Sequence, residues 1–103
     1  PNTKLIFSES PANPTLTLTD IAAVSEMAKS KGIPHVVDST FATPVIQRPI
    51  ELGADLVIQS TTKFYDGHNI TVGGAVISAT KPAIFSASFN TGTTTDRSMA
   101  AAA

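Results

Sequence analysis

Short apolar runs alternate with polar segments along most of the chain. Apolar runs of this length, bounded by proline, glycine and serine, predict buried strands. Strands are expected at 4–7, 33–38, 54–59 and 72–78. Within the second of these, Val36-Val37 places an apolar side chain on each face, which is typical of a parallel strand covered by helices on both sides.

Helices are expected between the strands. After the first strand, apolar residues recur at three- and four-residue steps and predict a helix with one apolar face. That face consists of Ile21, Val24, Met27 and Ala28. Thr19 or Asp20 is expected to cap this helix, and Gly32 to end it. A short helix is expected at 44–52 and another at 81–89, so the alternation of strands and helices predicts an α/β fold with right-handed crossovers.

The composition excludes several classes of partner. Seven basic and eight acidic residues give a formal net charge of −1, which is not the charge of a protein that binds nucleic acid or an anionic membrane. The chain has no cysteine, so it forms no disulfide and no thiolate metal site. Its apolar runs are shorter than the ~20 residues of a membrane-spanning helix. We therefore expect no nucleic-acid partner and no membrane partner.

The two ends of the chain carry no functional motif. The sequence begins Pro1-Asn2-Thr3 without an initiator methionine or a targeting segment, and we expect that its natural N-terminus is missing. Residues 98–103 are of low complexity and end in alanines. We therefore divide the chain into one domain at 1–97 and a tail at 98–103.

Polar residues follow the ends of three predicted strands. Asn13 follows the first strand, Asp38 closes the second, and Ser60-Thr61-Thr62-Lys63 follows the third. Ligands of open α/β sheets bind outside the carboxyl ends of the strands, so these residues are expected to meet at one edge. Pyridoxal 5′-phosphate (PLP) requires an acid beside its pyridine nitrogen, a lysine for its aldehyde and hydroxyls for its phosphate. Asp38, Lys63 and the flanking Ser60 and Thr62 offer these groups.

The residues at these strand ends belong to motifs that occur in a fixed order. The motifs are Glu9-Ser10-Pro11-Ala12-Asn13-Pro14, Val36-Val37-Asp38-Ser39-Thr40-Phe41-Ala42-Thr43-Pro44, Leu52-Gly53-Ala54-Asp55, and Ser60-Thr61-Thr62-Lys63 followed by Gly67-His68. They resemble the E-S/T-P-x-N-P, V-V-D-N-T-F-x-S/T-P, L-G-A-D and S-x-T-K…G-H patterns of the Cys/Met-metabolism PLP-dependent enzymes. That family includes cystathionine γ-synthase, cystathionine β- and γ-lyases, methionine γ-lyase and O-acetylhomoserine sulfhydrylase.

The resemblance implies a fold, an activity and an assembly. It implies that 1–97 is part of the large, mainly parallel-sheet domain of a fold-type I enzyme, the domain that binds PLP. The implied reaction is elimination or replacement at the β- or γ-carbon of a sulfur amino acid, a small-molecule substrate. The implied parent protein is a cytoplasmic homotetramer built from dimers. Family members complete the site with residues from elsewhere, so the isolated chain is expected to be inactive.

The resemblance also assigns roles to individual residues. Lys63 matches the catalytic lysine that binds PLP covalently, and Asp38 matches the partner of the pyridinium nitrogen. Ser60 and Thr62 match hydroxyls that contact the phosphate. Asn13 matches an asparagine near the PLP 3′-oxygen and the substrate carboxylate. The implied cofactor-binding set is Lys63, Asp38, Ser60, Thr62, Asn13 and Thr40.

One further position matches the family, and three positions or runs depart from it. Thr40 matches a residue that orients the aspartate of the site. Ser39 stands where the family usually has asparagine, and Thr61 where it usually has alanine. Residues 64–66 stand where a glycine-containing run is common. None of these departures removes a reacting group.

Two other functions stay open at this point. The chain could be a catalytically inert fragment whose sheet packs against partners, or part of another PLP enzyme such as an aminotransferase, which the Glu9-to-Pro14 motif disfavours. His35 and His68 could bind a metal together with Asp38 or Asp66, but their spacing matches no metal-ligand pattern. No metal site is therefore expected.

Overall fold

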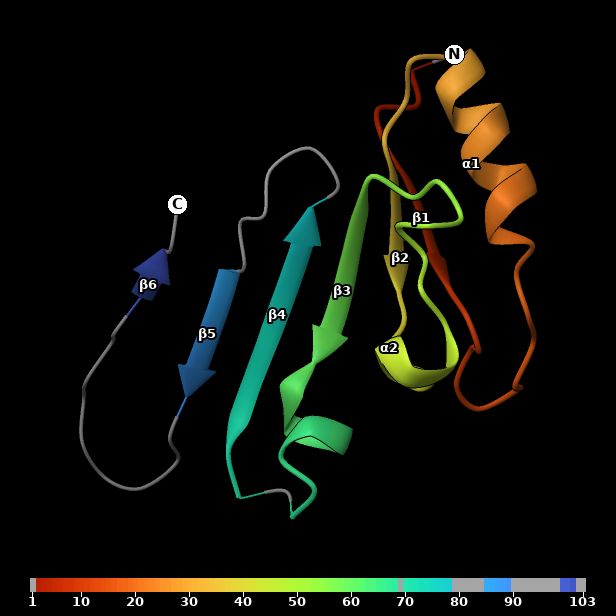
Figure 1. Cartoon of the computed structure of the whole chain (residues 1–103). Helices are drawn as coiled ribbons and strands as arrows, with labels where there is room; N and C mark the ends of the chain where they lie inside the picture. Colours follow the sequence, from red (N-terminus) through yellow and green to blue (C-terminus); the bar gives the residue numbers. More distant parts are fainter. Residues whose placement is uncertain (1, 69, 79–84, 90–98, 102–103) are drawn as a thin grey trace.

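The computed structural model describes residues 2–68, 70–78, 85–89 and 99–101, which form one mixed sheet with helical segments (Figure 1). Within these residues the sheet has six strands, and their order in space follows their order in the sequence. They are β1 (Ile6–Glu9), β2 (His35–Asp38), β3 (Leu56–Ser60), β4 (Val72–Ser78), β5 (Phe85–Phe89) and β6 (Met99–Ala101). Strands β1 to β3 are parallel, and each later strand is antiparallel to the one before it. The predicted α/β class is confirmed.

Strand β5 contradicts one prediction. A helix was expected at 81–89, but the described part of that range, Phe85–Phe89, is a strand paired with β4; residues 81–84 lie outside the described residues. The segment Phe-Ser-Ala-Ser-Phe alternates apolar and polar residues with the period of a strand. Strand β4 offers an edge of unpaired backbone groups, and β5 satisfies them. Strand β6 lies within 98–103, the segment expected to be a tail.

Helix α1 (Ile21–Ser30) begins and ends as its sequence predicts. The Asp20 side chain accepts a hydrogen bond from the Ala23 amide at 3.0 Å, which satisfies one free donor of the first turn. Gly32 has a φ of +64°, the left-handed conformation that glycine adopts without steric cost after a helix. No helix in the described part of the chain is long and apolar enough to cross a membrane.

The buried face of α1 differs in part from the predicted face. Ile21 and Ala28 are buried as expected, but Met27 is 53% exposed. Ser25 is buried instead, because its hydroxyl lies 2.8 Å from His35 Nδ1 on β2. This polar contact sets the rotation of the helix against the sheet. A small apolar core forms beside it from Ile21, Val37 and Ala54.

His35 is fully buried at the start of β2. Besides Ser25, its ring contacts β1, where Ser8 Oγ lies 2.8 Å from Nε2. Its backbone amide donates to Asp55 Oδ2 at 2.9 Å. Burial lowers the pKa of His35, and the nearby Asp55 carboxylate partly opposes this effect. The neutral imidazole therefore ties together α1, β1 and β2.

Helix α2 (Thr43–Ile46) is shorter than the helix expected at 44–52. Gln47 already has an extended backbone (φ −138°, ψ 132°), and hydrogen-bonded turns follow as far as Gly53. Pro49 explains the early end, because proline clashes with a preceding helical turn and disfavours helical backbone at the residue before it. Gly53 has a φ of +100°, and a Cβ there would lie 3.2 Å from Ser25 Cβ, so the position requires glycine.

The carboxyl ends of β1, β2 and β3 lie at the same edge of the sheet, at the bottom of Figure 1. Helix α2 follows β2 at this edge, and the short helical turn η1 (Thr61–Tyr65) follows β3. The parallel register places Glu9 of β1 opposite Asp38 of β2, and Asp38 opposite Ile58 of β3. The three loops that carry the predicted site residues therefore leave the sheet side by side.

Candidate active site

An open cleft of about 590 Å³ lies at the carboxyl edge of the parallel strands. Its volume is within the ~300–1,000 Å³ typical of ligand and cofactor pockets. It is lined by Glu9, Asn13, Asp38, Thr40, Phe41, Ser60, Lys63, Phe64 and Gly67. Five of the six residues assigned to the cofactor thus share one cleft, and Thr62 is the exception.

Asp38 is held in place by the next loop. Its Oδ1 accepts a hydrogen bond from the Thr40 amide at 2.9 Å and one from the Thr40 hydroxyl at 2.6 Å. The same hydroxyl accepts a hydrogen bond from the Ser60 amide at 2.8 Å. Thr40 therefore connects the carboxylate on β2 to the end of β3. Both bonds to Asp38 end on Oδ1, and no donor in the described part of the chain bonds Oδ2.

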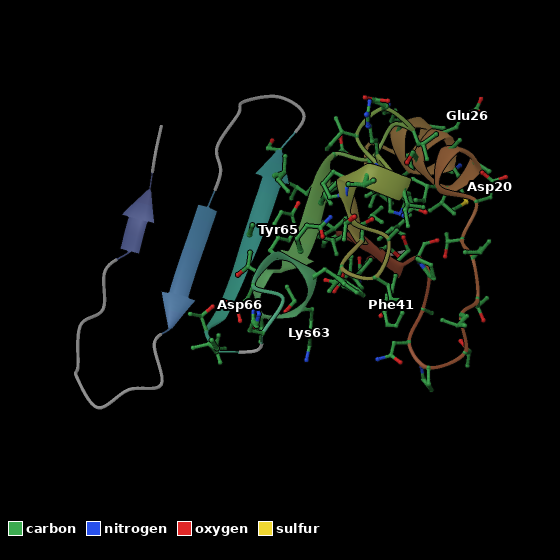
Figure 2. The ribbon with its side chains drawn as sticks, turned by 60° about the horizontal axis from the view of Figure 1, so that its bottom comes forward. Asp20, Glu26, Phe41, Lys63, Tyr65 and Asp66 are labelled. Atoms are coloured by element: carbon green, nitrogen blue, oxygen red, sulfur yellow. The ribbon has the colours of Figure 1, made fainter. Side chains whose placement is uncertain are left out.

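Lys63 lies in the middle of η1, where the backbone departs from helical geometry (φ −87°, ψ −106°). Its side chain is exposed and makes no hydrogen bond or ion pair with any residue that the structure describes. Figure 2 shows it projecting outward from the turn, below the ribbon. The amine therefore lines the cleft without a bonded partner in the described part of the chain.

Thr62 anchors η1 to β4. Its Oγ1 accepts a hydrogen bond from the Gly73 amide at 2.9 Å and lies 3.3 Å from the Gly73 carbonyl oxygen, to which it donates. The hydroxyl is thereby directed toward β4 and away from the cleft lining. In this conformation Thr62 fixes the turn that carries Lys63, while the Ser60 side chain lines the cleft.

Asn13 reaches the cleft from the loop after β1. Its backbone amide donates to Glu9 Oε1 at 3.2 Å, and both residues line the cleft. The peptide bonds before Pro11 and Pro14 are cis. Asn13 itself is exposed, so its position depends on how the base of this loop is held.

Two aromatic residues of the cleft were not singled out from the sequence. The rings of Phe41 and Phe64 meet edge to face, with centroids 6.0 Å apart and planes at 74°. Such pairs stabilise a fold by about 0.5–1.5 kcal/mol beyond the contribution of the surface area that they bury. They join the loop after β2 to η1. Phe41 lies within the Val36-to-Pro44 motif, and its place beside Asp38 and Thr40 in that motif could have indicated that it lines the cleft.

Asp66 fixes the loop that leaves η1. Its carboxylate accepts hydrogen bonds from the Ile70 amide at 2.6 Å and the Thr71 hydroxyl at 3.1 Å. The bond from the Ile70 amide is the largest cause that lowers the pKa of Asp66. The same loop carries Gly67 of the cleft, whose φ of +72° favours glycine.

The histidines are engaged in structural contacts. His35 is buried between two serines, and His68 Nδ1 lies 3.4 Å from the Asp66 carbonyl oxygen. Among the residues that the structure describes, no three histidine, aspartate or glutamate side chains are grouped to hold a metal ion.

Comparison with known proteins decides the family. The model of the Cys/Met metabolism PLP-dependent enzymes matches residues 1–101. The chain belongs to this PLP-dependent family. The *Bacillus subtilis* cystathionine gamma-lyase is 48% identical over 79% of the chain, and the *Pseudomonas aeruginosa* O-succinylhomoserine sulfhydrylase is 54% identical over 74%.

Solved structures agree with the Cys/Met-metabolism assignment. A methionine gamma lyase from *Micromonospora echinospora* superimposes with a TM-score of 0.74 at 47% identity over 76% of the chain. A cystathionine gamma synthase from *Xanthomonas oryzae* gives 0.72 at 50% identity over 74% of the chain. The chain spans about a fifth of the length of these relatives, whose covered shares are 19–21%. The fold-type I assignment of the chain is thereby confirmed.

The cleft has groups that fit PLP. Asp38 offers Oδ2 to a protonated ring nitrogen, and Lys63 offers an unbonded amine to an aldehyde. Ser60 offers a hydroxyl from the cleft lining to a phosphate oxygen. Thr62 fits less directly, because its hydroxyl must turn away from the Gly73 carbonyl to donate to a phosphate.

Proposed function

We propose that the protein carrying this chain is a PLP-dependent enzyme that eliminates or replaces a β- or γ-substituent of a sulfur amino acid. The observation that carries the proposal is that Asp38 and Lys63 line one cleft in a chain whose family depends on PLP. Its relatives include a cystathionine gamma-lyase, an L-methionine gamma-lyase and an O-succinylhomoserine sulfhydrylase, which are named for substrates of this class. A homo-oligomeric parent in the cytoplasm is part of the same proposal.

The residues of the cleft have separate tasks in this reaction. PLP, when bound, supplies an electron sink for the carbanion formed at the substrate Cα. Asp38 holds a negative charge beside the ring nitrogen, and Thr40 fixes its orientation. Lys63 would hold the cofactor aldehyde through Nζ. Its amine, when free, would take the α-proton of the substrate and return it later.

The remaining residues bind and orient. Ser60 would contact the phosphate, and Asn13 would hold the 3′-oxygen of the ring and the substrate carboxylate. Phe41 and Phe64 supply an apolar part of the cleft wall. The match to the family motifs and the position of Ser60 and Asn13 in the cleft lining support their two roles.

The test is covalent labelling of the full-length protein. Borohydride reduction of the PLP-loaded enzyme, followed by peptide mass mapping, is expected to place a pyridoxyl group on Lys63. A label on Lys31 or Lys81 with none on Lys63 would contradict the assignment. Release of 2-oxo acid from cystathionine, methionine or O-acylhomoserine then identifies an elimination substrate, and consumption of added thiol with O-acylhomoserine identifies a replacement. The isolated 103-residue chain is expected to catalyse neither.

A further inference from the structure

Gln47 connects two strand ends of the cleft, although its side chain does not line the cleft. It follows α2, and its Nε2 donates to the Ser10 carbonyl oxygen at 2.8 Å and to Ser39 Oγ at 3.1 Å. Ser10 comes directly after β1, and Ser39 directly after β2. Both serines are buried, with 1% and 0% of their surface exposed. The two N–H groups of one amide therefore bridge the ends of two neighbouring strands.

Ser10 is the base of the loop that carries Asn13. Its amide donates to the Asp38 carbonyl oxygen at 3.1 Å, and its hydroxyl accepts from the Thr19 amide at 3.2 Å, which closes the loop. Residues 13–18 of this loop are exposed. The base therefore determines where Asn13 lies, and Gln47 supplies a side-chain bond to that base from another element.

We propose that Gln47 is a positioning residue that holds the Asn13 loop against the Asp38 loop. The inference rests on the proposed function, because it acts through the contact of Asn13 with the cofactor. A buried carbonyl that loses its donor is costly, so the loop is expected to shift to recover a partner when Gln47 is lost. Ser39, which departs from the family pattern, is part of this bridge because its hydroxyl is one of the two acceptors.

The variant Gln47→Met tests the bridge in the full-length enzyme. Methionine keeps the volume of the side chain and removes both donors. PLP is stripped and titrated back by absorbance, and amide hydrogen exchange is followed over residues 10–19. We expect PLP to bind about tenfold more weakly, the effect of losing about one net hydrogen bond, and exchange in the loop to be faster. The matched control is Arg48→Ala, whose exposed ion pair with Glu51 lies outside the bridge; a change below about twofold is expected.

A double-mutant cycle with Asn13→Ala separates positioning from general stability. If Gln47 acts through Asn13, Gln47→Met changes PLP affinity by less than about twofold once Asn13 is alanine. Additive effects would overturn the inference, and so would an Asn13→Ala variant that binds PLP normally. Pyridoxyl labelling of Lys63 in the same samples reports on the proposed function separately. If Gln47→Met does not fold, Gln47→Glu, which also lacks the donating amide, takes its place in the cycle with the same two outcomes.

Discussion

The ends of β2 and β3 meet in one cleft but hold their functional side chains in opposite ways. At the end of β2, the Asp38 carboxylate is fixed by two hydrogen bonds from Thr40. At the end of β3, Lys63 is exposed and unbonded within the described part of the chain. A charge that stabilises a cofactor must be preorganised, because reorientation during the reaction would cost energy. A group that forms a bond and then carries a proton must be free to move.

The same contrast extends to the supporting residues. Around Asp38, hydrogen bonds restrain the functional side chain itself. Around Lys63 they restrain the backbone, because Thr62 ties η1 to Gly73 and Asp66 ties the following loop to Thr71. The fold therefore fixes the point from which the lysine extends and leaves its side chain mobile. Substitutions at the two strand ends should differ accordingly.

Removal of the mobile amine is expected to have the largest effect on activity and almost none on stability. Lys63→Ala in the full-length enzyme should lower kcat/KM by at least about 10⁴-fold, since both covalent binding and proton transfer are lost. Its side chain is exposed, so its removal leaves no buried cavity and the free energy of unfolding of the stripped protein should change by less than about 0.5 kcal/mol. Steady-state kinetics and urea unfolding measure the two quantities. Activity within tenfold of wild type would mean that another amine does the chemistry.

Neutralising the fixed carboxylate is expected to have the next largest effect. Asp38→Asn keeps the size of the side chain and removes its charge, so kcat should fall by about 100-fold or more. Stability should change little, because the asparagine Oδ1 can still accept both bonds from Thr40. Kinetics at saturating PLP give the result. Near-normal turnover would show that the carboxylate is structural.

Thr40 should lie between these cases, because it acts only through its bonds. Thr40→Val removes the 2.6 Å bond to Asp38 and the acceptor of the Ser60 amide. We expect kcat to fall about tenfold and the free energy of unfolding by about 1–3 kcal/mol. Thr40→Ser keeps the hydroxyl and is the matched control. Equal losses in the two variants would rule out the hydroxyl as the cause.

The sequence predicted the cleft better than it predicted the sheet around it. The strand at 72–78 was predicted residue for residue. Asn13, Asp38 and Lys63 line one cleft, as expected for residues that follow the carboxyl ends of neighbouring parallel strands. Strand β5 was missed because the alternation over Phe85–Phe89 is only five residues long, and its pairing with β4, which local propensity does not contain, supports the strand. Periodicity also placed Met27 in the core, whereas the helix instead buries Ser25, whose hydroxyl is hydrogen-bonded with His35.

Other parts of the site depend on contacts between distant segments. The sequence around Thr62 does not indicate that its hydroxyl is hydrogen-bonded to Gly73, which lies eleven residues later on β4. The contact between Phe41 and Phe64 likewise joins two loops that the sheet brings together. Motifs therefore predicted which residues belong to the cleft, and only the fold shows which neighbours hold them.

The smallest expected effect concerns the opposite end of β2, where His35 is buried far from any role in the reaction. Because burial lowers its pKa, the unfolded chain takes up a proton at a higher pH than the folded chain. Its contribution to stability is therefore complete above the ordinary pKa of 6.5 and declines as the pH falls below that value. Urea unfolding of the full-length protein between about pH 7.5 and 5 measures this decline, and His35→Gln should reduce its slope, as one titrating group is removed. His68→Gln, which replaces a histidine outside the contacts that hold His35, is the control for the substitution itself. If the free energy of unfolding depends on pH equally in wild type and His35→Gln, His35 titrates alike in the folded and unfolded chains. Burial at the start of β2 would then not change the charge state of this side chain.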